Sequence, residues 1–220
     1  MKKIVFGFLV VLSQVAYSQT SKNFGDFSSV KAYDRINVTL VKSSENKVEI
    51  SGDDSDVEIV NKNGELKIRM IPTKIMQGDK VSVTVFYENL NEIQASQGSK
   101  ITSEDAVESG ILNITSNEGS ILNLKIEADI LNAKTNSGGI INISGTAKTQ
   151  DVLVNSGANF NGRNLKSEVT SVTTNAGGNA DVYASKTVTA TNRAGGNINV
   201  YGSPENRNTK NMLGGKINFR

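Results

Sequence analysis

The feature that most constrains the fold is a glycine that recurs about every nineteen residues through the C-terminal part of the chain. The spacings between successive glycines are 21, 19, 19, 20, 18 and 19 residues. The glycines of this series are Gly98, Gly119, Gly138, Gly157, Gly177, Gly195 and Gly214. A period of this length is typical of repeat proteins, in which each repeat buries its apolar face against its neighbours.

Polarity alternates along the residues that follow each glycine. The third and fifth residues are mostly apolar, as in Ile141 and Ile143, whereas the fourth is polar. A similar alternation precedes the glycine. Because a period of two is typical of a strand with one buried face, each repeat is expected to hold at least two short strands. They meet at a corner where glycine accepts a positive φ.

The length of one repeat indicates the architecture. Nineteen residues of extended chain measure about 60 Å, which fits one coil of a parallel β-helix whose coils stack about 4.8 Å apart. The repeats are rich in Asn, Thr, Ser and Gly, which are poor helix formers, so leucine-rich repeats are disfavoured. We therefore predict an all-β fold, a parallel β-helix (solenoid) with coils of about 19 residues. The handedness of the solenoid stays open.

Asparagine dominates the fourth position after the glycine. The residues of this column are Asn123, Asn142, Asn161, Asp181, Asn199 and Asn218. Each amide offers donors and an acceptor, so the column predicts a hydrogen-bonded ladder between coils. We interpret it first as structural. Asn142 and Asn199 are also candidate binding residues.

The N-terminal third lacks the period but still reads as strands. Residues 24–88 contain several alternating runs, and Asn63-Gly64 between two of them is a strong hairpin signal. An open solenoid end would expose apolar interior and unpaired strand. We therefore expect one domain over residues 19–220, in which 24–88 form irregular wider first coils or a cap and 89–220 form the regular repeats.

The first eighteen residues are predicted to be a secretory signal peptide. Lys2 and Lys3 precede a short apolar run, and Ala16-Tyr17-Ser18 fits a signal peptidase site. The run is too short to span a bilayer of about 30 Å, and no later stretch is long enough. Removal of residues 1–18 leaves 22 basic and 22 acidic residues. A neutral chain without a basic block is a poor nucleic-acid binder.

Two absences narrow the chemistry. The chain contains no Cys and no His. Cys or His nucleophiles, Ser-His-Asp triads, Cys/His zinc sites and disulfides are thereby excluded. We expect no cofactor.

Several segments, taken in order after the signal peptide, resemble the family of putative auto-transporter adhesin, head GIN domains. They are residues 27–30 (FSSV), 35–40 (RINVTL), 47–52 (KVEISG), 63–68 (NGELKI), 81–85 (VSVTV), 139–143 (GIINI) and 196–200 (GNINV). The resemblance covers nearly the whole mature chain. It implies a β-helical fold, export into the envelope of Gram-negative bacteria and an adhesin role. It implies no catalytic residues.

The sixth position after the glycine supplies the main binding candidates. Tyr183 and Tyr201 occupy it in successive coils, and Arg163 occupies it in an earlier coil. Aromatic and arginine side chains on a flat β face could bind sugar rings or a protein partner. The alternative, which we favour, is a cross-coil pair that only stabilises stacking.

Acidic residues give two further hypotheses. Asp53, Asp54 and Asp56, with Glu58 close by, could supply oxygen ligands to Ca²⁺, but Gly52 to Asp56 also reads as a plain turn between strands. We favour the turn and assign no metal site.

The acids of the repeats raise the question of catalysis. Asp151 and Asp181, in neighbouring repeats, could be the paired carboxylates of a polysaccharide-cleaving enzyme. Fold analogy alone is a poor guide to function, and isolated acids in polar columns are usually solvated. We therefore assign no catalytic residue.

Together these features predict a non-enzymatic exported envelope protein, in the periplasm or at the cell surface. It would bind glycan or protein through flat β-helix faces. The alternatives are a periplasmic scaffold for envelope maintenance and, less favoured, a polysaccharide-cleaving enzyme. The last strand, at residues 216–220, is also a candidate surface for homo-oligomer formation.

Overall fold

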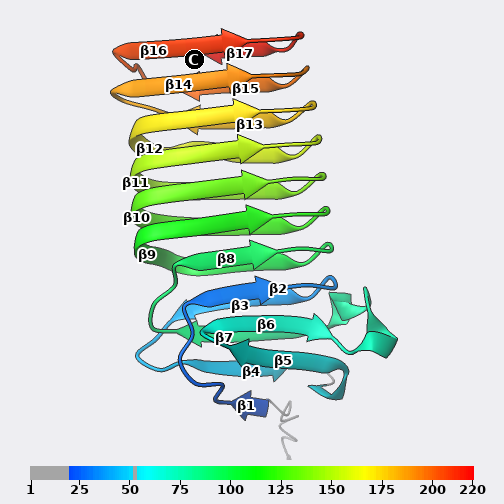
Figure 1. Ribbon diagram of the computed structural model, residues 1–220. Coiled ribbons are helices and arrows are strands. Elements are labelled where there is room, and N and C mark those ends of the chain that lie inside the picture. The colour runs from blue at the N-terminus through cyan, green and yellow to red at the C-terminus, as the bar shows by residue number, and fades with distance from the viewer. Residues whose placement is uncertain (1–19, 52–53) are drawn as a thin grey trace, which may run out of the picture.

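The fold is an all-β solenoid whose coils stack along one axis (Figure 1). The computed structural model describes residues 20–51 and 54–220. Register partners in adjacent coils lie 19 residues apart, as for Leu122 and Ile141. The prediction of a parallel β-helix with coils of about 19 residues is therefore confirmed. The predicted signal peptide and Asp53 lie outside the described residues.

The regular repeats form the larger part of the stack. Their strands are β8 (Glu92–Ala95), β9 (Lys100–Ser116), β10 (Ile121–Thr135), β11 (Ile140–Val154), β12 (Asn159–Thr174), β13 (Asn179–Tyr183), β14 (Thr187–Asn192), β15 (Asn197–Tyr201), β16 (Asn206–Asn211) and β17 (Lys216–Phe219). The longest strands bend, so that their first and last parts pair on two opposite faces. Each coil thus has a tight corner on one side and a wide bend on the other.

The tight corner is a pair of residues in the left-handed region. Gly119 has a φ of 71°, and Glu118 before it has a φ of 55°. Most of the other corners follow the same plan, and non-glycine residues as different as Ser137 and Ala176 take the first position. The corner at Gly195 is an exception, because Ala194 before it does not have a positive φ. Glycine tolerates this conformation without cost, whereas the preceding residue is held in it by the corner.

The apolar columns predicted from the alternation point inward. Buried columns stack through the coils on both faces, for example Leu122, Ile141 and Phe160 on one face. Next to the tight corner the buried column turns polar. Its Ser116 hydroxyl bonds to Ser120, and the Ser120 hydroxyl donates to the Ala95 carbonyl at 2.7 Å. Small polar residues therefore fill the narrow corner and satisfy its backbone.

The N-terminal strands stack in an order that differs from their order in the chain. They are β1 (Thr20–Lys22), β2 (Ser29–Ala32), β3 (Asn37–Lys42), β4 (Lys47–Ser51), β5 (Val57–Lys62), β6 (Glu65–Met70) and β7 (Ser82–Tyr87). Strand β2 lies between β6 and β8, and β3 lies between β7 and β9, all in parallel. The first coil of the chain is therefore inserted between the β6–β7 coil and the regular repeats.

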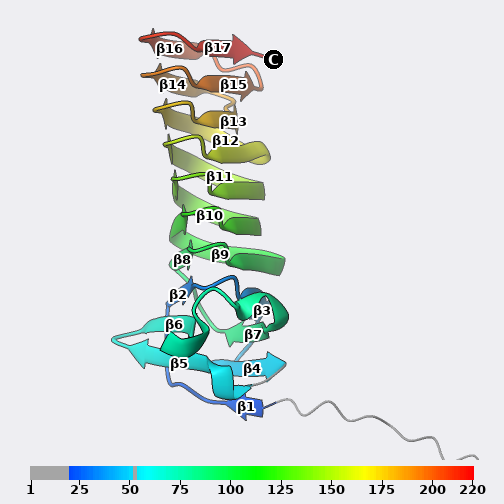
Figure 2. The same cartoon turned by 90° about the vertical axis from the view of Figure 1, so that its right-hand side faces the viewer.

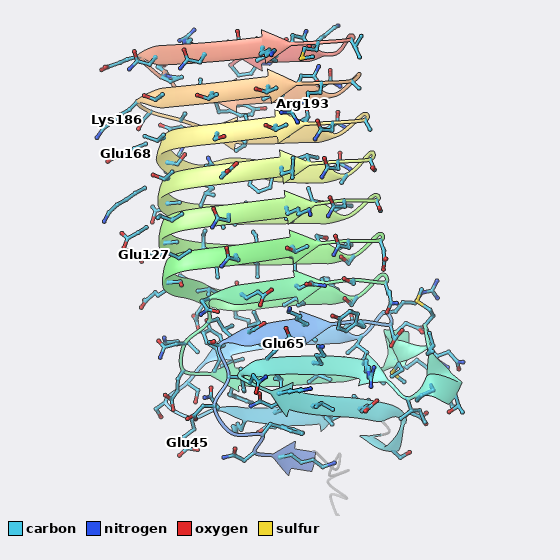
Figure 3. All side chains as sticks on the ribbon, viewed as in Figure 1. Glu45, Glu65, Glu127, Glu168, Lys186 and Arg193 are labelled. Carbon is cyan, nitrogen blue, oxygen red and sulfur yellow. The ribbon has the colours of Figure 1, made fainter. Side chains whose placement is uncertain are left out.

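Specific contacts hold the inserted coil. Lys31 of β2 makes ion pairs with Glu65 of β6 at 2.5 Å and with Glu92 of β8 at 3.2 Å. Figure 3 labels Glu65. The coil turns at Asp34 and Arg35, whose φ values are 60° and 65°. This corner has the geometry of the others but contains no glycine, which explains why the sequence period misses it.

Antiparallel strands cover the N-terminal end of the stack. Strand β5 pairs with β6, and β4 pairs with β7 and β1. The hairpin predicted at Asn63-Gly64 joins β5 and β6, and both residues have positive φ. Residues 24–88 thus supply both the expected first coils and the expected cap. The predicted hairpin accounts for the antiparallel pairing of β5 with β6, whereas the antiparallel pairing of β4 with β7 and β1 was not predicted.

An expanded corner joins β6 to β7. It contains two short 3₁₀ helices, Pro72–Lys74 and Gly78–Lys80, and a third such helix, Asp54–Asp56, precedes β5. In Figure 2 the tight corners face the viewer, and this loop lies beside the inserted coil. The buried Asp34 carboxylate accepts a hydrogen bond from the Met70 backbone amide at 3.1 Å. The backbone carbonyl of Asp34 accepts a hydrogen bond from the Gly78 amide at 3.0 Å. These bonds fix the loop to the inserted coil.

A buried tyrosine makes the N-terminal coils sensitive to alkali. The pKa of Tyr87 is raised to about 12, first by burial and then by the negative charges of Asp105 and Glu108. A tyrosine in an unfolded chain has a pKa near 10. Because the folded value is higher, the contribution to stability is complete below about pH 10 and is lost as the pH rises towards 12.

We therefore expect the wild-type chain to lose more unfolding free energy between about pH 10 and 12 than Tyr87→Phe loses. Urea titrations across this range measure the difference. Equal losses in the two proteins would show that Tyr87 titrates as it does in the unfolded chain.

Candidate functional site

A large open groove lies along the wide bend of the described solenoid. It has a volume of about 780 Å³ and runs across five successive coils. Its floor consists of small side chains one above another, Ser109, Ala128, Ala147, Ser167 and Ser185. In the middle of the groove these side chains turn inward, since Ala147 and Ser167 are buried. The open space lies between the exposed side chains of the residues on either side of this column.

One rim of the groove is an alternating column of charges. From coil to coil it reads Gly110, Asp129, Lys148, Glu168 and Lys186. Lys148 pairs with Asp129 at 2.5 Å, and Lys186 pairs with Glu168 at 2.6 Å. Glu168 and Lys186 lie along the same edge of the solenoid in Figure 3. The negative and positive charges of this rim therefore balance within the rim.

The other rim is polarised along the axis. Glu108 and Glu127 are direct register neighbours at one end, Thr146 follows, and Lys166 lies at the other end. The Lys166 ammonium lies 4.0 Å from the centre of the Tyr183 ring, which closes that end of the groove. Like charges in adjacent strands are unfavourable, whereas a cation over an aromatic ring is favourable.

The structure brings Tyr183, Tyr201 and Arg163 together. Tyr183 and Tyr201 are register partners in β13 and β15, and the Arg163 guanidinium lies 5.4 Å from the Tyr201 ring centre. Arg163 lies where the register of β12 shifts by one residue. These contacts are the cross-coil stacking that we favoured from the sequence. Because Tyr183 also lines the groove, the binding role stays a prediction.

Asn142 and Asn199 belong to the predicted ladder. The Asn142 amide donates to Asn123 at 2.7 Å, and the Asn161 amide donates to Asn142 at 2.7 Å. Further along, Asn199 donates to Asp181 at 2.8 Å, and Asn218 donates to Asn199 at 3.0 Å. Every bond thus has the same direction, from the later coil to the earlier one.

The ladder is interrupted at Asp181. A carboxylate has no N–H to donate to the Asn161 oxygen, so two acceptors face each other between these coils. Replacing Asp181 by asparagine should complete the ladder and raise the unfolding free energy by about 0.5–1 kcal/mol.

Guanidinium denaturation measures this gain, and Glu205→Gln, which removes one exposed negative charge outside the ladder, is the control. We expect no gain in the control. A fall in stability for Asp181→Asn would mean that the charged bond from Asn199 outweighs the new one.

A second ladder lies at the tight corner and was missed from the sequence. Asn136 donates to Asn117, Asn155 to Asn136 and Asn175 to Asn155, each at 2.7 Å. The signal was present, because these residues all stand two places before a corner glycine.

The acidic candidates do not converge. Asp151 lies in the last part of β11 and Asp181 in β13, on opposite faces of the solenoid. Asp56 pairs with Lys74 at 3.6 Å, and the Glu58 carboxylate accepts from Arg69 at 2.9 Å. Within residues 20–51 and 54–220 no group of three or more acidic side chains is placed to hold a metal ion.

In the part of the chain that the structure describes, no helix is long and apolar enough to cross a bilayer.

The comparison with protein-family models identifies one family. The family model described as "Putative auto-transporter adhesin, head GIN domain" matches residues 26–204. Among curated proteins, none matches the sequence.

Solved structures of similar fold include proteins from Bacteroides and Parabacteroides species. A putative adhesin from Bacteroides fragilis superposes with a TM-score of 0.86 at 18% identity, covering 94% of this chain and 98% of its own. A putative adhesin from Parabacteroides distasonis gives 0.72 at 21%, with 92% and 96% covered. A putative lipid binding protein from the same species gives 0.67 at 15%, with 92% and 96% covered. At these identities the likeness establishes the fold.

Proposed function

The chain belongs to the putative auto-transporter adhesin, head GIN domain family, and from this premise we propose that it is an exported, non-enzymatic binding module of the bacterial envelope. Its ligand would be a glycan or a protein held on the outer surface of the solenoid. The predicted signal peptide at residues 1–18 supports export.

The observation that carries the proposal is the groove on the wide bend. Five coils present side chains there at a spacing of about 4.8 Å on a backbone that is paired on both sides. Such a surface is rigid, so a ligand loses little binding energy to ordering the protein. Tyr183 offers an aromatic face at one end, which is the kind of side chain that anchors binding.

Binding is tested with the mature chain on glycan arrays and with solubilised envelope proteins. Tyr183→Ala should weaken the retained interaction by about tenfold or more. Lys166→Ala removes a cation of the groove and should therefore weaken the binding of an anionic ligand and strengthen that of a cationic one. The control is Thr189→Ala, an exposed position on a face away from the groove. Equal binding by all four proteins would contradict a role for the groove.

Protease treatment of intact cells decides where such binding could occur. If the chain is digested while a periplasmic marker survives, the protein is displayed outside and acts as an adhesin. If digestion requires an opened outer membrane, the ligand is periplasmic and the scaffold function is favoured.

A further inference from the structure

We propose that the groove binds a linear oligosaccharide that carries free amino groups. This inference rests on the proposed function and names the ligand class of the same site. Three properties of the groove lead to it: its length, the imbalance of charge on its rims and the direction in which it runs.

The groove suits a chain-like ligand of a few sugars. Five coils, about 4.8 Å apart, give it a length of about 19 Å. Its volume of about 780 Å³ lies within the range of small-molecule sites. Ala147 and Ser167 in the middle of the floor are buried, so no side chain rises from the floor there and a ligand can lie along the groove between its two rims.

The charge imbalance calls for a cationic ligand. Among the described residues, neither Glu108 nor Glu127 has an ion pair or side-chain hydrogen bond, and the two carboxylates are register neighbours. Asp105 lies nearby, since both it and Glu108 act on Tyr87. The cations of the groove are engaged elsewhere, Lys148 with Asp129 and Lys166 with the Tyr183 ring. An ammonium group of the ligand over Glu108 and Glu127 would supply the missing positive charge.

The direction of the groove favours a sugar over a peptide. It crosses the strands at right angles to the chain, where backbone amides and carbonyls already pair between coils. It therefore offers no open sheet edge to which an extended peptide could add as a strand. Tyr183 lines the far end of the groove, and the part of its ring that the Lys166 ammonium does not cover suits the apolar face of a sugar ring. Figure 3 shows Glu127 and Glu168 on the same side of the stack, directed away from it.

The test uses a set of tetrasaccharides that differ mainly in charge. Calorimetric titration of the mature chain at about pH 6 compares tetraglucosamine, its fully N-acetylated form and tetragalacturonate. We expect tetraglucosamine to bind about tenfold or more tightly than the acetylated form and tetragalacturonate not to bind. Equal affinity for the free and acetylated forms, or no binding of tetraglucosamine, would overturn the inference.

A pair of double variants separates the groove from general attraction. Glu108→Gln with Glu127→Gln should lower the affinity for tetraglucosamine about tenfold, without lowering the thermal midpoint, because a like-charge contact is removed. Glu118→Gln with Glu205→Gln removes the same charge at exposed positions outside the groove and should change nothing. Equal losses in both double variants would mean non-specific attraction.

Two further outcomes distinguish this inference from the proposed function. If Tyr183→Ala weakens binding of a ligand found on the arrays while the Glu108 and Glu127 double variant does not, the groove binds but the amino-sugar inference is wrong. Tetralysine that binds as tightly as tetraglucosamine would also overturn it, in favour of a basic peptide.

Discussion

Phe160→Ala is expected to lower the free energy of unfolding by about 3–5 kcal/mol. The ring is fully buried in β12, between Ile141 of the earlier coil and Ala180 of the later one. Gly162 beside it also leaves room, since a Cβ at that position would collide with the ring. The ring thus fills space that its small neighbours leave, and its removal opens a cavity that the paired backbone cannot close.

Guanidinium denaturation followed by far-ultraviolet circular dichroism measures this loss. Phe86→Ala truncates a half-exposed ring in β7 and should cost much less. A loss below about 1 kcal/mol for Phe160→Ala would mean that the coils collapse around the cavity. Because solenoids unfold in units, a second transition confined to the later coils would be consistent with the expectation.

Gly145→Ala is the second substitution with a large expected effect. Gly145 lies in the bend of β11 with a φ of 111°, and a Cβ there would collide with the Ile126 carbonyl oxygen of the neighbouring coil. The new methyl group would have to push adjacent coils apart or change the backbone. We expect a loss of about 2–5 kcal/mol from strain and overpacking together.

Gly110→Ala is the matched control for this substitution. It lies in the same bend two coils earlier, has no positive φ, and has open space where the new methyl group would lie. Its stability should stay the same or rise by about 0.5 kcal/mol. Equal stability of the two variants would show that the bend tolerates a side chain at position 145.

The sequence is informative wherever the side-chain pattern and the coil geometry coincide. Apolar residues three and five places after each glycine, such as Ile141 and Ile143, show the interior directly. Asparagine at the fourth place after the glycine predicts the hydrogen-bonded ladder between coils, which the structure contains. The inserted coil could not be predicted from the glycine period, because its corner is formed by Asp34 and Arg35 and contains no glycine. Its partner strands β6 and β8 also lie far from it in the sequence.

The groove could not be found by counting from the glycines. Lys148 stands ten residues after its corner glycine, Glu168 eleven and Lys186 nine, although the three form one column. The extra residue in β12 and the shorter coil after it shift the count. Tyr183 was a candidate by position alone, whereas its contact with Lys166 depends on the bend.

The position of the β2–β3 coil gives folding a direction. Its strands cannot find both partners until the chain as far as β9 has been made, so the first stable nucleus needs roughly half of the protein. Once that nucleus exists, each later coil meets a finished edge and adds through contacts about 19 residues apart. During synthesis from the N-terminus, folding would thus be delayed once, until β9 is available, and the folded solenoid would then grow by one coil at a time.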